Sequence, residues 1–154
     1  MSAAVTLQPA GPAEAAVMAA LQRACFPEDP WDAQSIATLA GQAGAFAVLA
    51  LAGEEPVGFV LARVAAEDGE IIAIGVLPDA RRGGVGRRLV AAAQDSAGRL
   101  GATALFLEVA EDNEAAKILY KTCGFSPVGR RPGYYIRPKG RVAALVLRYS
   151  YDSE

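Results

Sequence analysis

The sequence of 154 residues has no histidine and only two cysteines. Without histidine, a catalytic triad with a histidine base and a metal site with histidine ligands are both excluded. The cysteines, Cys25 and Cys123, match neither a disulfide framework nor the spacing of a metal site. We therefore expect no bound metal, and any acid–base chemistry must use glutamate, aspartate, tyrosine, lysine or cysteine side chains.

Long apolar runs and a large net charge are also missing. The longest apolar run, "AFAVLALA" at residues 45–52, is far too short to cross a membrane. The first stretch, "MSAAVTLQPAGPAEA", has neither the basic nor the apolar region of a signal peptide. The net charge of −2 gives no global basic field that attracts nucleic acid. We expect a reduced, soluble protein of the cytoplasm, with neither a membrane nor a nucleic acid as direct partner.

Hydrophobic residues make up 53% of the chain, which is enough to supply a core. No repeat, low-complexity linker or shift in composition marks a boundary, so we expect residues 1–154 to form one domain. Periodicity and turn residues predict the order β-α-α-β-β-β-α-β-α-β-β, an α/β protein with a mixed sheet. The expected strands are 4–7, 46–52, 56–64, 70–76, 103–109, 125–131 and 141–149, and the expected helices are 12–24, 32–40, 84–100 and 113–123. Residues 70–109 are expected to form a right-handed parallel crossover.

A turn rich in glycine and arginine, "PDARRGGVGRR" at 78–88, joins the strand at 70–76 to the next helix. It lacks the lysine of a Walker A loop and the third glycine of a dinucleotide fingerprint. Its glycines let the backbone approach a ligand, and free N–H groups at a helix start favour an anion. Arg87 and Arg88 lie in the first helical turn, where cations are unfavourable unless an anion such as pyrophosphate is bound. The turn is therefore either a phosphate site or a solvated basic turn.

The segment "LEVAEDNEAAKILYKTCGF" at 107–125 holds the candidate acid–base residues. Glu108 ends a strand at its carboxyl end, where ligand sites of α/β proteins concentrate, and Tyr120 lies on the following helix. Each residue has a simpler explanation: Glu108 can pair with a surface arginine, Tyr120 can pack in the core, and Asn113 can cap its helix. Cys123 fits a small buried apolar position. A second basic run is either a solvated face or a local anion site, and consists of Arg130, Arg131, Arg137, Lys139 and Arg141.

The pattern Arg81-x-x-Gly84-x-Gly86, after an "IGV" strand and a proline, resembles the acetyl-CoA motif of the GCN5-related N-acetyltransferases. Further segments in family order extend the resemblance from about residue 25 to residue 148: "CFPEDPW", "EIIAIGVLPDARRGGVGRRLV", "LEVAEDNEAAKILYKTCGF", "VGRRPGYY" and "GRVAALVL". Together they look like the RimI branch of this family. That branch acetylates the N-terminal amines of proteins, typically of a small-subunit ribosomal protein.

The resemblance implies a mixed sheet of six to seven strands flanked by about four helices. It implies acetyl-CoA as acetyl donor, Glu108 as general base and Tyr120 as general acid. The residues implied in acetyl-CoA binding are Ile74, Gly75 and Val76 for the pantetheine arm, Arg82, Gly83, Gly84, Val85, Gly86 and Arg87 for the pyrophosphate, and Asn113. Trp31, Tyr134 and Tyr135 either line a peptide groove or cover core edges.

The sequence departs from the family pattern at three places. Ala110 stands where an arginine often follows "LEV", Asp112 stands where a serine often precedes the asparagine, and 142–144 lack the common acid. These departures affect the peptide preference more than the chemistry. The resemblance implies an enzyme that acetylates the N-terminal amine of a protein, a ribosomal protein in particular, by direct attack. The alternatives are an acetyltransferase for lysine side chains or small amines, and a non-catalytic acyl-CoA-binding module.

Overall fold

A computed structural model of the protein describes residues 4–151, without the side chain of Arg82. Within this range the chain forms seven strands and four α-helices in the predicted order. The strands are β1 (Val5–Ala10), β2 (Ala45–Ala52), β3 (Glu55–Ala65), β4 (Asp68–Val76), β5 (Ala104–Ala110), β6 (Ser126–Arg137) and β7 (Gly140–Ser150). The helices are α1 (Ala15–Cys25), α2 (Ala33–Ala40), α3 (Val85–Arg99) and α4 (Glu114–Thr122), with 3₁₀ turns at Pro12–Glu14 and Pro78–Gly83.

The strands form one mixed sheet in the order β1-β2-β3-β4-β5-β7-β6. Every neighbouring pair is antiparallel except β4 and β5, which run parallel and are joined through α3. The predicted α/β class and the parallel crossover between β4 and β5 are therefore confirmed. A parallel pair needs such a crossover connection, and a helix usually provides it.

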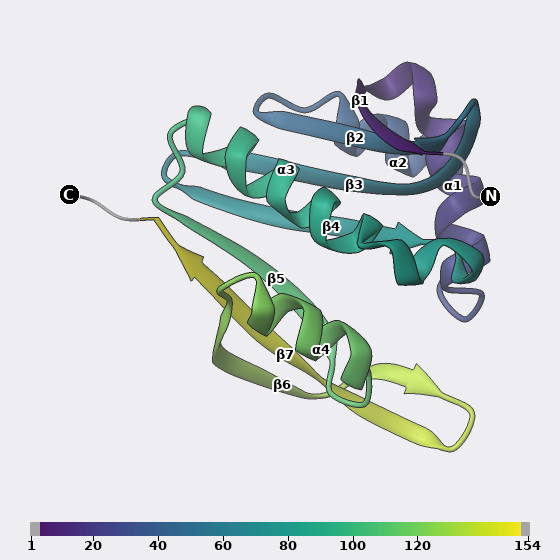
Figure 1. The fold of residues 1–154 in the computed structure, drawn as a ribbon. Helices are drawn as coiled ribbons and strands as arrows, with labels where there is room; N and C mark the ends of the chain where they lie inside the picture. The colour runs from purple at the N-terminus through teal and green to yellow at the C-terminus, as the bar shows by residue number, and fades with distance from the viewer. Residues whose placement is uncertain (1–3, 152–154) are drawn as a thin grey trace.

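The sheet splits between β4 and β5. These strands pair only over Asp68–Glu70 and Ala104–Phe106, at their amino ends. Beyond that point β4 continues to pair with β3 and β5 with β7, so the two halves of the sheet diverge (Figure 1). The edge of β4 that faces β5 from residue 71 onward therefore makes no ladder with it.

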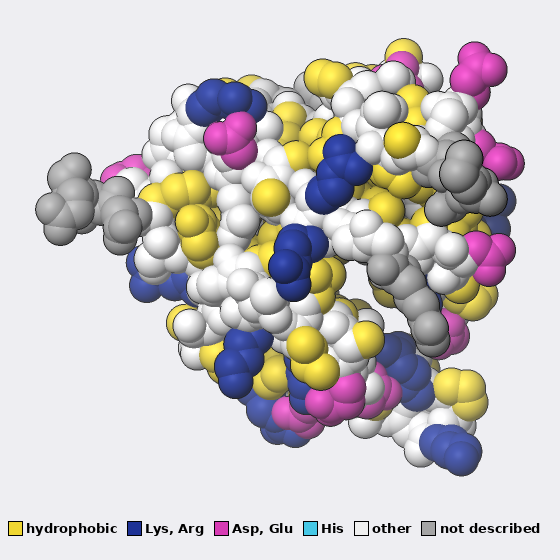
Figure 2. Space-filling model, in the orientation of Figure 1, with side chains coloured by type: hydrophobic (Ala, Val, Ile, Leu, Met, Phe, Trp, Pro, Cys, Tyr) yellow, Lys and Arg dark blue, Asp and Glu magenta, His cyan; other side chains and the backbone are white. Residues whose placement is uncertain are grey.

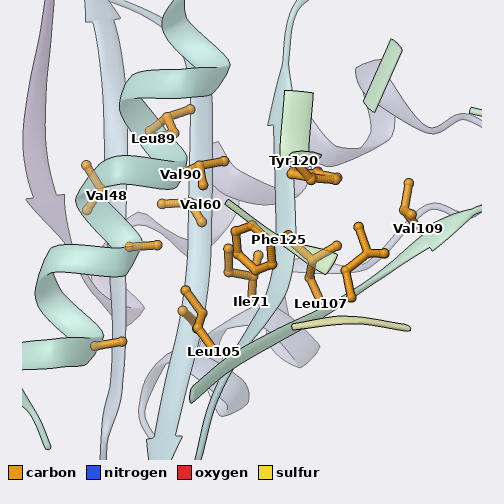
Figure 3. Close-up of a cluster of buried hydrophobic side chains, with 14 of the residues drawn as sticks. Val48, Val60, Ile71, Leu89, Val90, Leu105, Leu107, Val109, Tyr120 and Phe125 are labelled. Atoms are coloured by element: carbon orange, nitrogen blue, oxygen red, sulfur yellow. The ribbon is translucent and has the colours of Figure 1, made fainter. Parts of the chain in front are cut away.

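Two layers of helices cover the sheet. Helices α3 and α4 lie on one face, where Leu89 and Val90 of α3 pack on Val60 and Ile71 of the sheet (Figure 3). Helices α1 and α2 lie on the other face, against Phe59 and Leu61 among others. The buried residues of α3 lie along one face of the helix, at Val85, Leu89, Val90, Ala93 and Ala97. In residues 4–151 no helix combines the length and apolar character that crossing a membrane requires.

Two polar residues begin helices as the sequence predicts. The Asp32 carboxylate accepts a hydrogen bond from the Ser35 backbone N–H at 2.7 Å at the start of α2. The Asn113 side-chain oxygen accepts one from the Ala116 backbone N–H at 3.1 Å at the start of α4. Both contacts satisfy N–H groups that have no partner within the helix. Asn113 therefore has the capping role, and the start of α4 is fixed beside the end of β5.

Candidate active site

A hollow lies where β4 and β5 diverge. Its walls are Ile71–Ile74 of β4 and Leu107–Ala110 of β5. The remaining lining residues come from α1, the segment after it, α4 and β6: Gln22, Phe26, Glu28, Asp29, Trp31, Asn113, Ala116, Tyr120, Tyr135 and Arg137. Figure 2 shows this side of the molecule hollowed between the half that carries α3 and the half that carries α4. The fold thus brings Glu108, Tyr120 and Asn113 to one hollow.

Glu108 lines the hollow, and one of its carboxylate oxygens lacks a hydrogen-bond donor. Its Oε2 atom is shielded from solvent, and no described residue donates a hydrogen bond to it. The Nε atom of Arg131 lies 3.3 Å from Oε2, close enough for an ion pair but without hydrogen-bond geometry. A buried acceptor without a donor is unfavourable by about 1–3 kcal/mol, and such an atom in a native fold calls for an explanation. Glu108 therefore pairs with an arginine, which was its simpler explanation, and also lines the hollow.

Tyr120 approaches the hollow from α4. The side chain is buried and packs edge-on against Phe125, with ring centroids 6.0 Å apart. It belongs to the same buried cluster as Leu107 and Val109 of β5 (Figure 3). Burial raises the pKa of the Tyr120 hydroxyl well above its ordinary value, with smaller contributions from Cys123 and Tyr135. Tyr120 therefore packs in the core and also lines the hollow.

Tyr135 links the two candidate catalytic residues. Burial raises its pKa to about 12, and the negative charge of Glu108 contributes to the shift. Tyr135 lines the same hollow as Glu108 and Tyr120. The Arg137 guanidinium lies 5.3 Å from the centre of the Tyr135 ring. Tyr135 and Trp31 line the hollow, whereas Tyr134 is 51% exposed and is not part of its wall.

The last residues of β4 pack against the end of α1. The strand edge that faces β5 is unpaired there. A Cβ atom added at Gly75 would lie 3.0 Å from the Cys25 sulfur, so glycine lets the end of α1 approach this strand. Arg81 donates from Nε to the Val76 carbonyl at 2.9 Å. Burial raises the pKa of the Cys25 thiol, although Arg81 beside it acts in the opposite direction. Arg81 is thus engaged within the protein, and the unpaired edge from residue 71 to Ile74 and Gly75 stays available for a ligand.

The glycine-rich turn is open on its outer side. Gly84 has a φ of +76°, a conformation that favours glycine, and a Cβ atom added at Gly83 or Gly84 meets nothing within 4 Å. At Gly86 an added Cβ atom would lie 3.1 Å from Leu119 of α4, so this glycine allows α3 and α4 to approach. Arg88 donates to the Val5 carbonyl at 2.7 Å and does not extend over the turn.

Val85, which begins α3, is buried in the core, so only its backbone can serve a ligand at this turn. Arg87 is exposed and lies near Cys123, whose pKa it lowers against the larger effect of burial. The side chain of Arg82 lies outside the described part of the structure. Within the described residues, the turn therefore offers open backbone at Gly83 and Gly84 and the exposed side chain of Arg87.

Substitutions at Gly83 and Gly84 are expected to have different effects. Gly84→Ala should destabilise the fold by about 1 kcal/mol because the positive φ is strained for any residue with a Cβ atom. Gly83→Ala should leave the melting temperature within about 1 °C of wild type, because neither its backbone nor its surroundings oppose a methyl group. Thermal unfolding of both variants checks the difference, and equal losses would contradict the assignment of strain to Gly84.

The arginines of β6 are paired with acids at the end of β5. Arg130 makes a two-point contact with Glu111, at 2.7 and 3.0 Å, and Arg137 lies 3.8 Å from Asp112. Arg131 completes the series with Glu108. The sequence identified a basic run but not these partners. The pairing depends on β6 lying beyond β7, with Arg131 opposite Ala144 and Ala144 opposite Ala110.

Comparisons with known proteins agree with this arrangement. The sequence profile of the acetyltransferase (GNAT) family matches residues 15–125. The chain is 34% identical over 89 residues to the [ribosomal protein bS18]-alanine N-acetyltransferase of Escherichia coli K12, covering 58% of this chain and 60% of that protein. It is 43% identical over 83 residues to the N-alpha-acetyltransferase RimI of Mycobacterium tuberculosis, covering 54% of this chain and 50% of that protein. The match therefore spans less than two thirds of either relative.

The fold is similar to the crystal structure of the ribosomal-protein-S18-alanine N-acetyltransferase from Escherichia coli. The TM-score is 0.89 at 24% sequence identity, and the match covers 98% of this chain and 97% of that one. Similarity at this identity establishes the fold. Structures of the same fold have been solved with acetyl-CoA bound. The predicted fold, a mixed sheet of six to seven strands flanked by about four helices, is confirmed, with seven strands and four α-helices in residues 4–151.

Proposed function

Because the chain belongs to the acetyltransferase (GNAT) family, we propose that it transfers the acetyl group of acetyl-CoA to the N-terminal amine of a protein. The substrate we propose is a small-subunit ribosomal protein, and the place of action is the cytoplasm. Two relatives with modest identity support the choice of an N-terminal amine: one is named for an alanine of ribosomal protein bS18 and the other as an N-alpha-acetyltransferase.

The observation that carries the proposal is the orphaned oxygen of Glu108. Oε2 is buried without a hydrogen-bond donor, and Glu108 lines a hollow that Tyr120 also lines. A nucleophilic amine brings the N–H donor that this oxygen lacks. A general base and a general acid must act on opposite parts of one reacting group, and a shared hollow satisfies that requirement.

Glu108 and Tyr120 have separate roles in the proposed proton transfers. An α-amine has a pKa of about 7.7–8.0, so much of it is protonated near neutral pH and must lose a proton before it attacks. Glu108 accepts that proton, directly or through water. Acetyl-CoA supplies the thioester carbonyl carbon that the amine nitrogen attacks. Tyr120, which burial keeps protonated, donates its hydroxyl hydrogen to the sulfur that leaves.

The structure offers groups that fit acetyl-CoA along its length. The unpaired edge of β4 at Ile74, Gly75 and Val76 can hold the pantetheine arm through main-chain hydrogen bonds. The open glycine turn and the start of α3 can receive the pyrophosphate, where the N–H groups of a helix favour an anion. We propose that Asn113 combines its capping role with a contact to acetyl-CoA, since it also lines the hollow.

A peptide panel tests the choice of acceptor. One peptide carries a free N-terminal alanine and an internal lysine, and its matched partner has the same sequence with a blocked N-terminus. We expect acetyl-CoA consumption with the first peptide only, and mass spectrometry should locate the acetyl group on the α-nitrogen. Acetylation of the internal lysine in both peptides would contradict the proposal and indicate a lysine acetyltransferase. Acetylation of a small amine alone would also contradict it.

A further inference from the structure

A second hollow lies next to Glu108, where β4 and β5 are still paired. Its lining includes Arg63, Glu70, Phe106, Glu108 and Arg131. Glu70 is the last β4 residue that pairs with β5, and its partner is Phe106. Directly paired residues share a face of the sheet, as do residues two apart on one strand. Glu70 and Glu108 therefore project from the same face, one on each side of the point where the strands diverge.

Glu70, Glu108 and Arg131 form one electrostatic cluster. Arg131 lies 3.3 Å from Glu108 and also acts on Glu70. Glu70 is exposed at the rim of the hollow, but desolvation by the surrounding protein raises the pKa of its carboxyl, and the negative charge of Glu108 raises it further, while Arg131 acts in the opposite direction. Arg131 is thus within reach of both carboxylates, although in this structure its ion pair is with Glu108.

The charges of this cluster match a cationic amine. Two carboxylates and one guanidinium give a net charge of −1, which one ammonium group neutralises. Arg63 and Asp68 also line the hollow, and their opposite charges cancel. Arg148 is not among the lining residues and lies over Phe106, 5.9 Å from the ring centre. Without Glu70, Arg131 alone would neutralise Glu108, and an arriving ammonium would add an uncompensated positive charge.

We propose that Glu70 is a positioning residue of the acetyl-transfer site. When the substrate ammonium reaches Glu108, Glu70 receives the guanidinium of Arg131, and Glu108 is left free to bind the amine. The proton then moves from the amine nitrogen to the Glu108 carboxylate and on to solvent, while Glu70 and Arg131 remain paired. The inference rests on the proposed function, because it requires an amine that arrives as a cation.

The variant Glu70→Gln removes the charge and keeps the shape. We expect its KM for the N-terminal alanine peptide to rise about five- to tenfold, the effect of one lost charge interaction at a partly exposed site. The KM for acetyl-CoA should stay unchanged, because the residues proposed to bind it lie elsewhere on β4 and on the turn. Glu70→Asp, which keeps the charge, should retain most of the peptide affinity. An unchanged peptide KM in Glu70→Gln would overturn the inference.

Removing Arg131 provides the sharper test. In Glu70→Gln/Arg131→Gln the cluster again has a net charge of −1, so the double variant should recover most of the peptide affinity that Glu70→Gln loses. Recovery of this kind is a coupling that independent losses of packing do not produce. Losses that simply add would overturn the inference. If Glu70→Gln does not fold, Arg131→Gln alone serves: we expect it to lower the peptide KM, and a raised KM would count against the inference.

A neutral nucleophile separates this inference from the proposed function. A peptide with an aminooxy group in place of the α-amine is uncharged at pH 7.5, so Glu70→Gln should use it as well as wild type does. An equal loss with the charged and the neutral peptide would assign Glu70 a structural role. If wild type acetylates only a small amine, the proposed function fails, and the same comparison is then made with that amine.

Discussion

Glu108→Gln is expected to lower kcat by about 10²-fold or more, the usual effect of removing a general base. The amide keeps the size of the side chain but cannot accept the proton of the amine. The substitution also breaks the partly exposed ion pair with Arg131, and because such a pair contributes little, the melting temperature should fall by about 4 °C at most. Steady-state kinetics with saturating acetyl-CoA measure the effect, and thermal unfolding verifies the fold.

Glu111→Gln is the matched control for this experiment. Glu111 follows Glu108 by three residues and also pairs with an arginine of β6, but it does not line the hollow. We expect the control to keep kcat within about twofold of wild type, because an exposed ion pair contributes little. A folded Glu108→Gln variant with the turnover of wild type would exclude Glu108 as the base.

Tyr120→Phe is expected to lower kcat by about 10²-fold, because the leaving sulfur loses its proton donor. The phenyl ring preserves the edge-on contact with Phe125, so the variant should fold. A smaller effect is expected for Tyr135→Phe, which should raise the KM of the peptide more than it lowers kcat. Equal losses of kcat in the two variants would leave Tyr120 without its assigned role.

The pH dependence offers a separate check on Tyr120. Its folded-state pKa is raised, so the hydroxyl stays protonated above the ordinary tyrosine value of about 10. Stability linked to this proton is present below that pH and declines as the pH rises above it. We expect wild type to lose stability above about pH 10 more steeply than Tyr120→Phe does. Circular dichroism across this range measures it, and identical profiles would show that Tyr120 is not the group that titrates.

Much of the fold could be predicted from the sequence, because the local signals for helices, strands and turns agree with the order of the elements in the sheet. Asp32 and Asn113 mark helix starts by a contact that spans three residues, which a sequence motif can specify. The parallel pair of β4 and β5 follows from a strand, a long helix and a strand in succession. The glycine at position 84 likewise has a local cause, its positive φ at the start of α3.

The split of the sheet and the ion pairs of β6 could not be predicted in this way. That β4 and β5 part after Glu70 depends on how both halves of the sheet pack, not on either strand's own residues. Arg131 reaches Glu108 across β7, because Arg131 and Ala110 both lie opposite Ala144. The sequence did not indicate Glu70 as a site residue, because a glutamate near the start of a strand is commonly a surface residue.

A crystal structure with a bisubstrate analogue, in which coenzyme A is joined to the α-nitrogen of an N-terminal alanine peptide, tests the central claim most directly. We expect the analogue to cross the sheet between β4 and β5. Its sulfur should lie within about 3.5 Å of the Tyr120 hydroxyl, and its nitrogen should face Glu108 directly or through one water. A sulfur remote from Tyr120, or a nitrogen on the side of the sheet away from Glu108, would contradict the account.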